Sequence, residues 1–392
     1  MIFSERVKNL KPSPTLEVTA KAKELKAKGV DVISFGAGEP DFDTPDNIKQ
    51  SAIKAIKDGK TKYTPAGGIL ELREAVAEWF TREYSCEFSP EEIIISCGAK
   101  HSIYNVLQVL LNDGDEVIII APYWVSYPSM VELAGGKPVI VNTTFEEEFR
   151  INIEKLNRAI TPKTKAIIIN SPCNPTGMML LKEQYEKLAE ILFKRDIFVI
   201  SDDIYHKIVF EREFCNILMA EKSLKSKIII INGVSKTYSM TGWRIGFTGA
   251  NREIINAIAK IQSQSTSNPT SISQYAALEA ITGDQSCVEK MRKTFMERRK
   301  ITVEKINQIE GIKCLNPDGT FYLFPEISEI LINSNIKNSV EFCKKLLEDE
   351  KVAIVPGSAF GYENAFRMSF AISEDSILKG IERIEKFVKN LT

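Results

Sequence analysis

The sequence predicts an α/β protein with a mostly parallel, seven-stranded sheet sandwiched by helices and a smaller α/β domain built from both chain ends. Seven short runs rich in Ile and Val recur along the chain, separated by stretches long enough for helices. Runs that are apolar at successive positions indicate strands buried on both faces. The expected limits are residues 1–45 for the N-terminal segment of the small domain, 46–290 for the large domain and 291–392 for the C-terminal part of the small domain.

The predicted strands alternate with helical segments, which is typical of an open, mostly parallel sheet covered by helices. One predicted helix carries an apolar stripe at helical spacing, formed by Leu70, Leu72, Val76 and Trp79–Phe80. The strands are predicted at residues 93–96, 116–120, 138–141, 166–170, 197–201, 227–232 and 245–249.

The two chain ends differ from this pattern. Residues 12–29 read as a helix closed by Gly29. Thr44 reads as the N-cap of a second helix, with Pro45 at its first helical position. A long charged helix over residues 290–309 precedes a mixed helix–strand tail. We expect the N-terminal segment and this tail to build the smaller domain together.

Composition argues against several classes of protein. Lys+Arg 51 against Asp+Glu 52 gives no electrostatic reason to expect nucleic acid or an anionic membrane as partner. Seven scattered cysteines without a C-x-x-C pair, and only two histidines, argue against a disulfide framework and a metal site. The charged N-terminus lacks the apolar core of a signal peptide, and no apolar run approaches the roughly 18 residues of a membrane helix. We expect a cytoplasmic protein.

Polar residues follow three of the predicted strands directly. Lys236 follows strand 227–232, Asp202 and Tyr205 follow strand 197–201, and Asn174 follows strand 166–170. Open parallel sheets bind ligands at the carboxyl ends of their strands. We therefore expect these side chains to converge on one cleft.

These residue types suit pyridoxal phosphate. That cofactor needs a lysine amine for a Schiff base and a carboxylate that keeps its ring nitrogen protonated. It also needs a hydroxyl or amide near its phenolic oxygen, and backbone N–H groups with a cation for its phosphate. The residues able to supply these groups are, in turn, Lys236, Asp202, Tyr205 with Asn174, and the Gly98-Ala99-Lys100 turn with Arg244.

The segment GVSKTYSMTGWRIG (233–246) resembles the cofactor-attachment motif of class I pyridoxal-phosphate aminotransferases, with the lysine at Lys236. The resemblance extends from about residue 16 to about residue 367 and is closest to the bacterial and archaeal type of aspartate aminotransferase. It implies fold type I, in which the large domain binds the cofactor. The other motifs are AGEPDFDTP (37–45), KYTPAGG (62–68), PYWVSYP (122–128), SPCNPTG (171–177), DDIY (202–205) and PGSAFG (356–361).

The resemblance implies a role for each matching residue. Lys236 is expected to hold the cofactor and shuttle the proton, Asp202 to pair with the ring nitrogen, and Tyr205 and Asn174 to contact the phenolic oxygen. The resemblance further implies that Trp124 stacks on the ring. The phosphate is expected to be held by Gly98, Ala99, Lys100, Ser235 and Arg244, with Tyr63 reaching across from the neighbouring subunit of a homodimer.

For the substrate, the resemblance implies that Gly38 offers its backbone and that Arg367 grips the α-carboxylate, beside Trp124 and Asn174. By pattern alone, Trp124 reads as core and Arg367 as solvent-facing. Other branches of the family use a partner-subunit arginine near residues 265–274 for a distal carboxylate, and this stretch contains none. Lys100 is the candidate cation for the distal carboxylate of a dicarboxylic substrate, and Lys11 is a second candidate.

We therefore predict a ping-pong aminotransferase acting on L-aspartate and 2-oxoglutarate. The rival activities are an aromatic or prephenate aminotransferase and a C–S lyase that depends on the same cofactor. A non-enzymatic regulator with this fold would need a DNA-binding segment and its basic excess, and neither is visible in front of the motif at residue 37. His101 and His206 are assigned no functional role.

Overall fold

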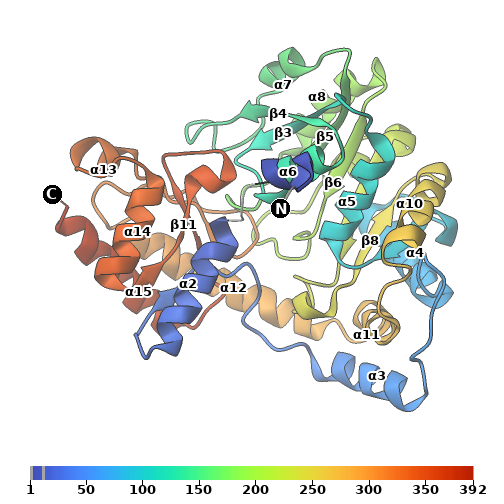
Figure 1. Cartoon of the computed structure of the whole chain (residues 1–392), viewed down its shortest axis with the longest axis horizontal. Coiled ribbons are helices and arrows are strands. Elements are labelled where there is room, and N and C mark those ends of the chain that lie inside the picture. The colour runs from blue at the N-terminus through green and yellow to red at the C-terminus, as the bar shows by residue number, and fades with distance from the viewer. Residues whose placement is uncertain (1–2, 11–13, 392) are drawn as a thin grey trace.

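The computed structural model describes residues 3–10 and 14–391, and its larger part is a seven-stranded sheet with helices on both faces (Figure 1). All seven strands predicted from the sequence are present, with ends that differ by two residues or fewer. Strand β8 runs antiparallel to both of its neighbours, and the other pairs are parallel. The spatial order is β2 (Ile93–Ser96), β8 (Gly246–Gly249), β7 (Ile228–Gly233), β6 (Phe198–Asp202), β5 (Thr164–Asn170), β3 (Glu116–Ala121) and β4 (Lys137–Asn142).

Side chains alternate between the two faces of this sheet, and each face has its own apolar core. Val199, Ile228 and Ile230 belong to the core beneath α3 (Asp46–Lys57), α4 (Leu70–Tyr84), α7 (Ile153–Ala159), α8 (Lys182–Phe193), α9 (Ile217–Ala220) and α11 (Ser271–Thr282). Ile200, Ile229 and Ile231 belong to the opposite core, beneath α5 (Ala99–Leu110), α6 (Ser126–Leu133) and α10 (Arg252–Ser265). Each fully buried Ile or Val contributes about 1.5–3 kcal/mol. The sandwich predicted from the Ile- and Val-rich runs is therefore confirmed.

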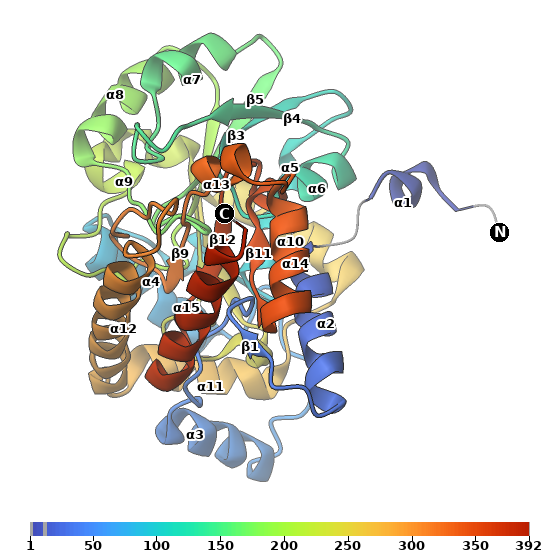
Figure 2. The same cartoon turned by 90° about the vertical axis from the view of Figure 1, so that its left-hand side faces the viewer.

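Both ends of the chain build the smaller part, as the sequence predicts. Strand β1 (Ile33–Ser34) pairs parallel with β10 (Val352–Ala353). A second small sheet has the order β11 (Val355–Pro356), β12 (Phe366–Ser369) and β9 (Tyr322–Leu323). The helices are α1 (Glu5–Asn9), α2 (Pro14–Ala27), α12 (Ser286–Ile306), α13 (Ser328–Asn333), α14 (Ser339–Glu350) and α15 (Glu374–Lys389), with α1 set apart from the rest (Figure 2). The domain limits at residues 45 and 290 stay a prediction.

One local prediction is wrong. Helix α3 begins at Asp46 with Pro45 in the cap position, one residue later than expected, and no side chain caps it. Thr44 instead donates its hydroxyl to the carbonyl of Ser239 (2.7 Å) and accepts from the indole nitrogen of Trp243 (2.9 Å). Its hydroxyl is engaged by a segment about 200 residues away, which competes with local capping. Thr44 thus ties the AGEPDFDTP segment to the loop that follows Lys236.

All seven cysteines carry free thiols. Across residues 3–10 and 14–391, no helix combines the length and the apolar character needed to cross a membrane.

Candidate functional site

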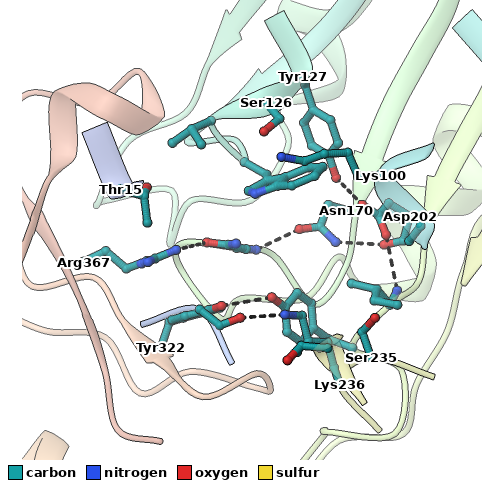
Figure 3. A pocket seen from close by; sticks show the side chains of 18 of the residues that line it. Thr15, Lys100, Ser126, Tyr127, Asn170, Asp202, Ser235, Lys236, Tyr322 and Arg367 are labelled. Carbon is teal, nitrogen blue, oxygen red and sulfur yellow. Dashed lines mark hydrogen bonds between the residues drawn. The ribbon is translucent and has the colours of Figure 1, made fainter. Parts of the chain in front are cut away.

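A cavity of about 320 Å³ lies at the carboxyl ends of β5, β6 and β7, where those strands meet the smaller part of the chain (Figure 3). The clusters that follow these strands converge there, as predicted. The predicted site residues that line it are Gly38, Ala99, Lys100, Trp124, Asn174, Asp202, Tyr205, Ser235, Lys236, Arg244 and Arg367.

Lys236 lies three residues beyond the end of β7, and its amine enters the cavity. Its Nζ donates a hydrogen bond to the carbonyl of Gly38 (2.6 Å), which belongs to the segment between β1 and α3. Burial lowers the pKa of Lys236 to about 8, and the nearby guanidinium groups of Arg367 and Arg244 act in the same direction, against Glu39 and Asp202. A lowered pKa makes the neutral amine, which is the nucleophilic and basic form, available near neutral pH.

Asp202 is the last residue of β6 and its carboxylate is buried. Oδ2 accepts a hydrogen bond from the hydroxyl of Tyr127 (2.6 Å) and Oδ1 accepts one from the backbone N–H of Ile204 (3.4 Å). Burial raises the pKa of Asp202 to about 6, while these hydrogen bonds and Lys236 favour the anion. An anionic carboxylate of this kind requires a positive partner in the cavity.

Arg367 lies on β12 and is only 2% exposed. Its guanidinium donates to Asn174 Oδ1 (3.0 Å) and to the carbonyl of Gly36 (2.9 Å), while Nε has no hydrogen-bond partner. The ring of Tyr322 lies 4.4 Å from it. Among the described residues no carboxylate forms an ion pair with Arg367. This buried cation therefore lacks an acidic counterion within its own chain, and the pattern-based expectation of a solvent-facing side chain is wrong.

The N-terminus of α5 and the guanidinium of Arg244 lie close together. Gly98, at the N-cap of α5, has a φ of 92° and no side chain to cap the helix. A Cβ at Gly98 would lie 2.5 Å from Nη2 of Arg244, and a Cβ at Gly246 would lie 2.3 Å from the backbone nitrogen of Ala99. Arg244 itself is held by the carbonyls of Thr241 (2.8 Å) and Cys97 (3.4 Å). Glycine at both positions thus lets a cation and a helix N-terminus meet, which is the combination that binds phosphate.

Lys100 and Trp124 lie beside one another on the cavity wall. The Nζ of Lys100 is 4.9 Å from the ring centroid of Trp124, a cation–π distance. Burial lowers the pKa of Lys100, and the charge of Arg244 adds to this effect. Trp124 also packs edge-to-face on Tyr127, with ring centroids 5.3 Å apart.

Two predicted residues among those that the structure describes, Gly98 and Tyr63, do not line the cavity of the single chain. Gly98 lies just behind the wall, where it supports Arg244. Tyr63 is 91% exposed and remote from the cavity of its own chain, as its expected role in a neighbouring subunit requires. Lys11 lies outside the described residues. His101 accepts from the backbone N–H of Cys97 (3.3 Å) and does not line the cavity.

Sequence reasoning assigned no role to several residues that the cavity contains. Asn170 donates to the carbonyl of Asp202 (2.8 Å) and accepts from the N–H of Asn174 (2.8 Å), so it joins the ends of β5 and β6. Asn170 could have been found from its place at the end of the predicted strand 166–170, and Tyr127 from its place in the PYWVSYP motif. Tyr322 hydrogen-bonds Tyr205 (3.1 Å between hydroxyl oxygens), and no local pattern marked it. Thr15, Val125, Ser126, Ile204 and Thr241 complete the lining.

The fold and this cavity define a pyridoxal-phosphate-dependent enzyme. A basic lysine, a buried carboxylate, an anion-binding helix start and a buried arginine occupy one cavity, and together they match the charge and the polar groups of that cofactor and of an amino acid. A family model described as aminotransferase class I and II matches residues 30–384. The chain belongs to this family, and its cofactor is pyridoxal phosphate.

Similar proteins cover essentially the whole chain. An aspartate aminotransferase of Bacillus sp. (strain YM-2) is 50% identical over 389 residues, which is 99% of each chain. An aspartate/prephenate aminotransferase of Nitrosomonas europaea is 48% identical, covering 98% of this chain and 99% of that protein. The structure of the Thermus thermophilus aspartate aminotransferase with maleate superposes with a TM-score of 0.94 at 42% identity, covering 98% of this chain and 99% of that one.

Proposed function

We propose that this enzyme transfers an amino group between L-aspartate and 2-oxoglutarate by a ping-pong mechanism. The observation that carries the proposal is Arg367, a buried cation without an acidic partner among the described residues, in the same cavity as Lys236. Buried charges are normally paired, so a substrate carboxylate is the partner expected there. The names of the similar proteins support aspartate as the amino donor.

Pyridoxal phosphate, when bound, supplies an electrophilic carbonyl carbon and a ring that withdraws electrons from the substrate α-carbon. The phosphate is proposed to bind at the start of α5, held by Ala99, Lys100, Ser235 and Arg244, with Gly98 leaving room for Arg244. Trp124 is proposed to lie on the face of the ring. These groups together fix the position and the plane of the ring.

Four side chains are proposed to set the charge of the ring, three by contact and Tyr127 through Asp202. Asp202 pairs with the ring nitrogen and keeps a proton there, and Tyr127 steadies Asp202 through its hydrogen bond. Tyr205 and Asn174 contact the phenolic oxygen. By holding that proton, Asp202 would favour the electron-withdrawing form of the ring.

Lys236 is proposed to hold the cofactor covalently and, once substrate displaces it, to move the α-proton as a general base. The pKa of about 8 keeps a sizeable fraction of this amine neutral at physiological pH. Gly38 accepts a hydrogen bond from the amine, so its carbonyl holds Lys236 near the cavity between steps. Arg367 orients the α-carboxylate in bidentate fashion beside Asn174.

Lys100 is proposed to bind the distal carboxylate of a dicarboxylic substrate, since it is the other lysine on the cavity wall. The aromatic or prephenate aminotransferase stays as the second candidate, because relatives named aspartate/prephenate aminotransferase are nearly as similar as those named for aspartate alone. Both candidates share Lys236, Asp202 and Arg367 and differ in what Lys100 binds.

The deciding experiment mixes the yellow holoenzyme with single amino acids and follows conversion to the pyridoxamine form by absorbance. Fast conversion by aspartate and glutamate, with slow conversion by phenylalanine and alanine, is the expected result. A preference for phenylalanine or prephenate-derived amino acids would replace the aspartate assignment with the second candidate.

We also propose a cytoplasmic homodimer with shared active sites. Seven free thiols suit a reducing compartment, and the exposed ring of Tyr63 suits a contact with a second subunit. Sedimentation of the holoenzyme tests the dimer, and Tyr63→Phe should weaken cofactor binding only if that hydroxyl reaches the neighbouring site.

A further inference from the structure

Strand β6 ends at Asp202, and a second aspartate, Asp203, follows it directly with its side chain on the opposite face of the sheet. Asp202 faces the cavity, whereas Asp203 faces the core beneath α4 and is only 1% exposed. The carboxylate of Asp203 accepts hydrogen bonds from the hydroxyl of Ser201 (2.7 Å) and from Nδ2 of Asn216 (2.7 Å). A buried carboxylate with this many donors is a built feature of the core, and no step proposed above uses it.

A second buried polar group lies at the end of β7, four residues before Lys236. The amide oxygen of Asn232 accepts from the backbone N–H of Gly233 (2.8 Å), which fixes the orientation of the amide. Its Nδ2 therefore faces the hydroxyl of Tyr84 (2.9 Å) and Nδ1 of His206 (3.1 Å) and donates to both. Burial lowers the pKa of His206 to about 3, so this ring is neutral, and because the facing amide nitrogen can only donate, Nδ1 is the accepting nitrogen.

The hydroxyl of Tyr84 connects these two strand ends. Because it accepts a hydrogen bond from Asn232, its own proton is available to the carboxylate of Asp203. Burial raises the pKa of Tyr84, and the charge of Asp203 adds to this effect. His206 joins the same two strand ends, since its backbone N–H donates to the carbonyl of Asp203 (3.0 Å). Tyr84 is the last residue of α4 and is fully buried. One hydroxyl thus links the residue after Asp202 to the residue that begins the turn to Lys236.

We propose that this core-side network (Ser201, Asp203, Asn216, Tyr84, Asn232 and His206) positions Asp202 relative to Lys236 for catalysis. The inference rests on the roles proposed above for Asp202 and Lys236. The members of the network touch neither substrate nor cofactor, so they are positioning residues. Asp203 N–H also donates to the carbonyl of Ile231 (2.9 Å), so backbone and side chains join the same two strand ends.

The physical argument is one of geometry. Asp202 would pair with the ring nitrogen of the cofactor, while Lys236 would bond the carbonyl carbon attached to the same ring. The size of the cofactor therefore sets the distance required between the two side chains. Small displacements of catalytic groups are costly in rate. Strands β6 and β7 pair with each other up to Asp202 and Ile231, and β8 holds β7 as far as Gly233. Beyond the pairing of β6 with β7, the network supplies the side-chain links between the two strand ends, and its loss removes them.

The test compares two tyrosines that are equally buried in the same core. Tyr84→Phe removes the linking hydroxyl, whereas Tyr185→Phe removes a hydroxyl that bonds neither Asp203 nor Asn232. In Tyr84→Phe holoenzyme we expect kcat about tenfold lower, the KM for aspartate within about twofold, and a cofactor dissociation constant several-fold higher. We also expect the pH midpoint of the cofactor absorbance to shift by about half a unit or more.

A merely structural role would lower the melting temperature of both variants alike and leave the absorbance midpoint unmoved. Unchanged kcat and midpoint in Tyr84→Phe, or equal losses in Tyr185→Phe, would overturn the inference. These results would leave the proposed function intact, because that function is tested separately by Lys236→Ala, by Asp202→Asn and by the amino-acid preference of the holoenzyme.

A second pair of variants tests the link itself. Asp203→Asn retains an oxygen that can accept from Tyr84, whereas Asp203→Ala does not. We expect Asp203→Asn to keep most of kcat and Asp203→Ala to lose as much kcat as Tyr84→Phe. The double variant that combines Tyr84→Phe with Asp203→Ala should show no further loss of kcat. Additive losses would contradict a shared link. Should Asp203→Ala fail to fold, the comparison of Tyr84→Phe with Asp203→Asn decides, since only the former removes the link.

Discussion

At the ends of β6 and β7, both faces of the sheet carry buried polar residues. The two sets differ in how many hydrogen-bond partners they have within the chain. On the cavity face, Lys236, Asp202 and Arg367 are buried charges that share few partners within the chain. On the core face, Asp203 and Asn232 are hydrogen-bonded from several sides. The difference teaches that burial of a polar group does not by itself mark function. The site is marked by buried polar groups that lack some of their hydrogen-bond or charge partners within the chain and can therefore bind a ligand.

A pair of buried arginines makes the same comparison away from these strands. Arg299 is as buried as Arg367, but it pairs with Glu211 (2.7 Å) and with the carbonyl of Pro317 (2.9 Å). Arg299 forms a structural ion pair with Glu211, whereas Arg367 is available to bind a carboxylate from outside the chain. Four variants test this division, beginning with the largest expected effect.

Replacing Lys236 by Ala removes the group on which the cavity face depends most. We expect kcat to fall by about 10³-fold or more, since a positioned general base contributes about 10²–10⁴-fold and the covalent attachment is lost as well. The variant should still fold and bind the cofactor noncovalently, which absorbance and thermal melting measure. Near-normal turnover would contradict the role of Lys236.

Replacing Arg367 by Lys separates the two arginines. Lysine keeps the charge and loses the bidentate geometry, so the KM for aspartate should rise about 100-fold, corresponding to about 3 kcal/mol. The matched variant Arg299→Lys should lower the melting temperature and leave KM within about twofold. Steady-state kinetics and thermal melting on both variants provide the measurement, and the opposite assignment of effects would refute the comparison.

The raised pKa of Asp202 predicts a stability effect in the cofactor-free protein. The folded-state pKa of about 6 exceeds the ordinary 3.8, so the folded state binds more protons between these values and stability falls as pH rises through that window. Asp202→Asn lacks this fall, so at pH 7 and above it should be more stable than the parent by about 3 kcal/mol.

Cofactor binding should reverse that order, because the charge of the ring nitrogen then pairs with Asp202. Chemical unfolding at pH 4 and pH 7, with and without pyridoxal phosphate, measures both effects. Asp203 also has a raised pKa, of about 7, to which the charge of Asp202 contributes, so Asp202→Asn lowers the pKa of Asp203 and adds to the gain in stability. A variant that is less stable than the parent in the cofactor-free state at pH 7 would contradict the electrostatic account.

Replacing Lys100 by Met should have the smallest effect. We expect kcat/KM for aspartate to fall about tenfold and that for phenylalanine to change little, because only aspartate loses a charge-assisted hydrogen bond. Lys225→Met is the matched control, since Lys225 also lies over an aromatic ring (4.5 Å from the centroid of Phe88) but outside the cavity. Equal losses for both amino acids would assign Lys100 to the cofactor phosphate alone.

The sequence was sufficient for the residues whose signal is local. Runs of Ile and Val predict three parallel strands, and those strands are followed by Lys236, Asp202 and Asn174. Because the strands are parallel, their carboxyl ends meet at one edge of the sheet. The strand limits were recovered to within two residues for the same reason, because periodicity is a property of neighbouring positions. Thr44 was misread because its hydroxyl bonds a residue about 200 positions away.

Tertiary structure alone decided the environments of the charged groups. Alternation placed Arg367 opposite an apolar face, but only the packing of β12 against Tyr322 and Asn174 buries it in the cavity. Asp202 and Asp203 are identical in type and adjacent in sequence, and Tyr84, more than 100 residues earlier, distinguishes the core-side one. Local patterns fix which face of a strand a side chain takes, whereas its partners come from elements that the fold brings in from elsewhere along the chain, and those partners decide its charge and its role.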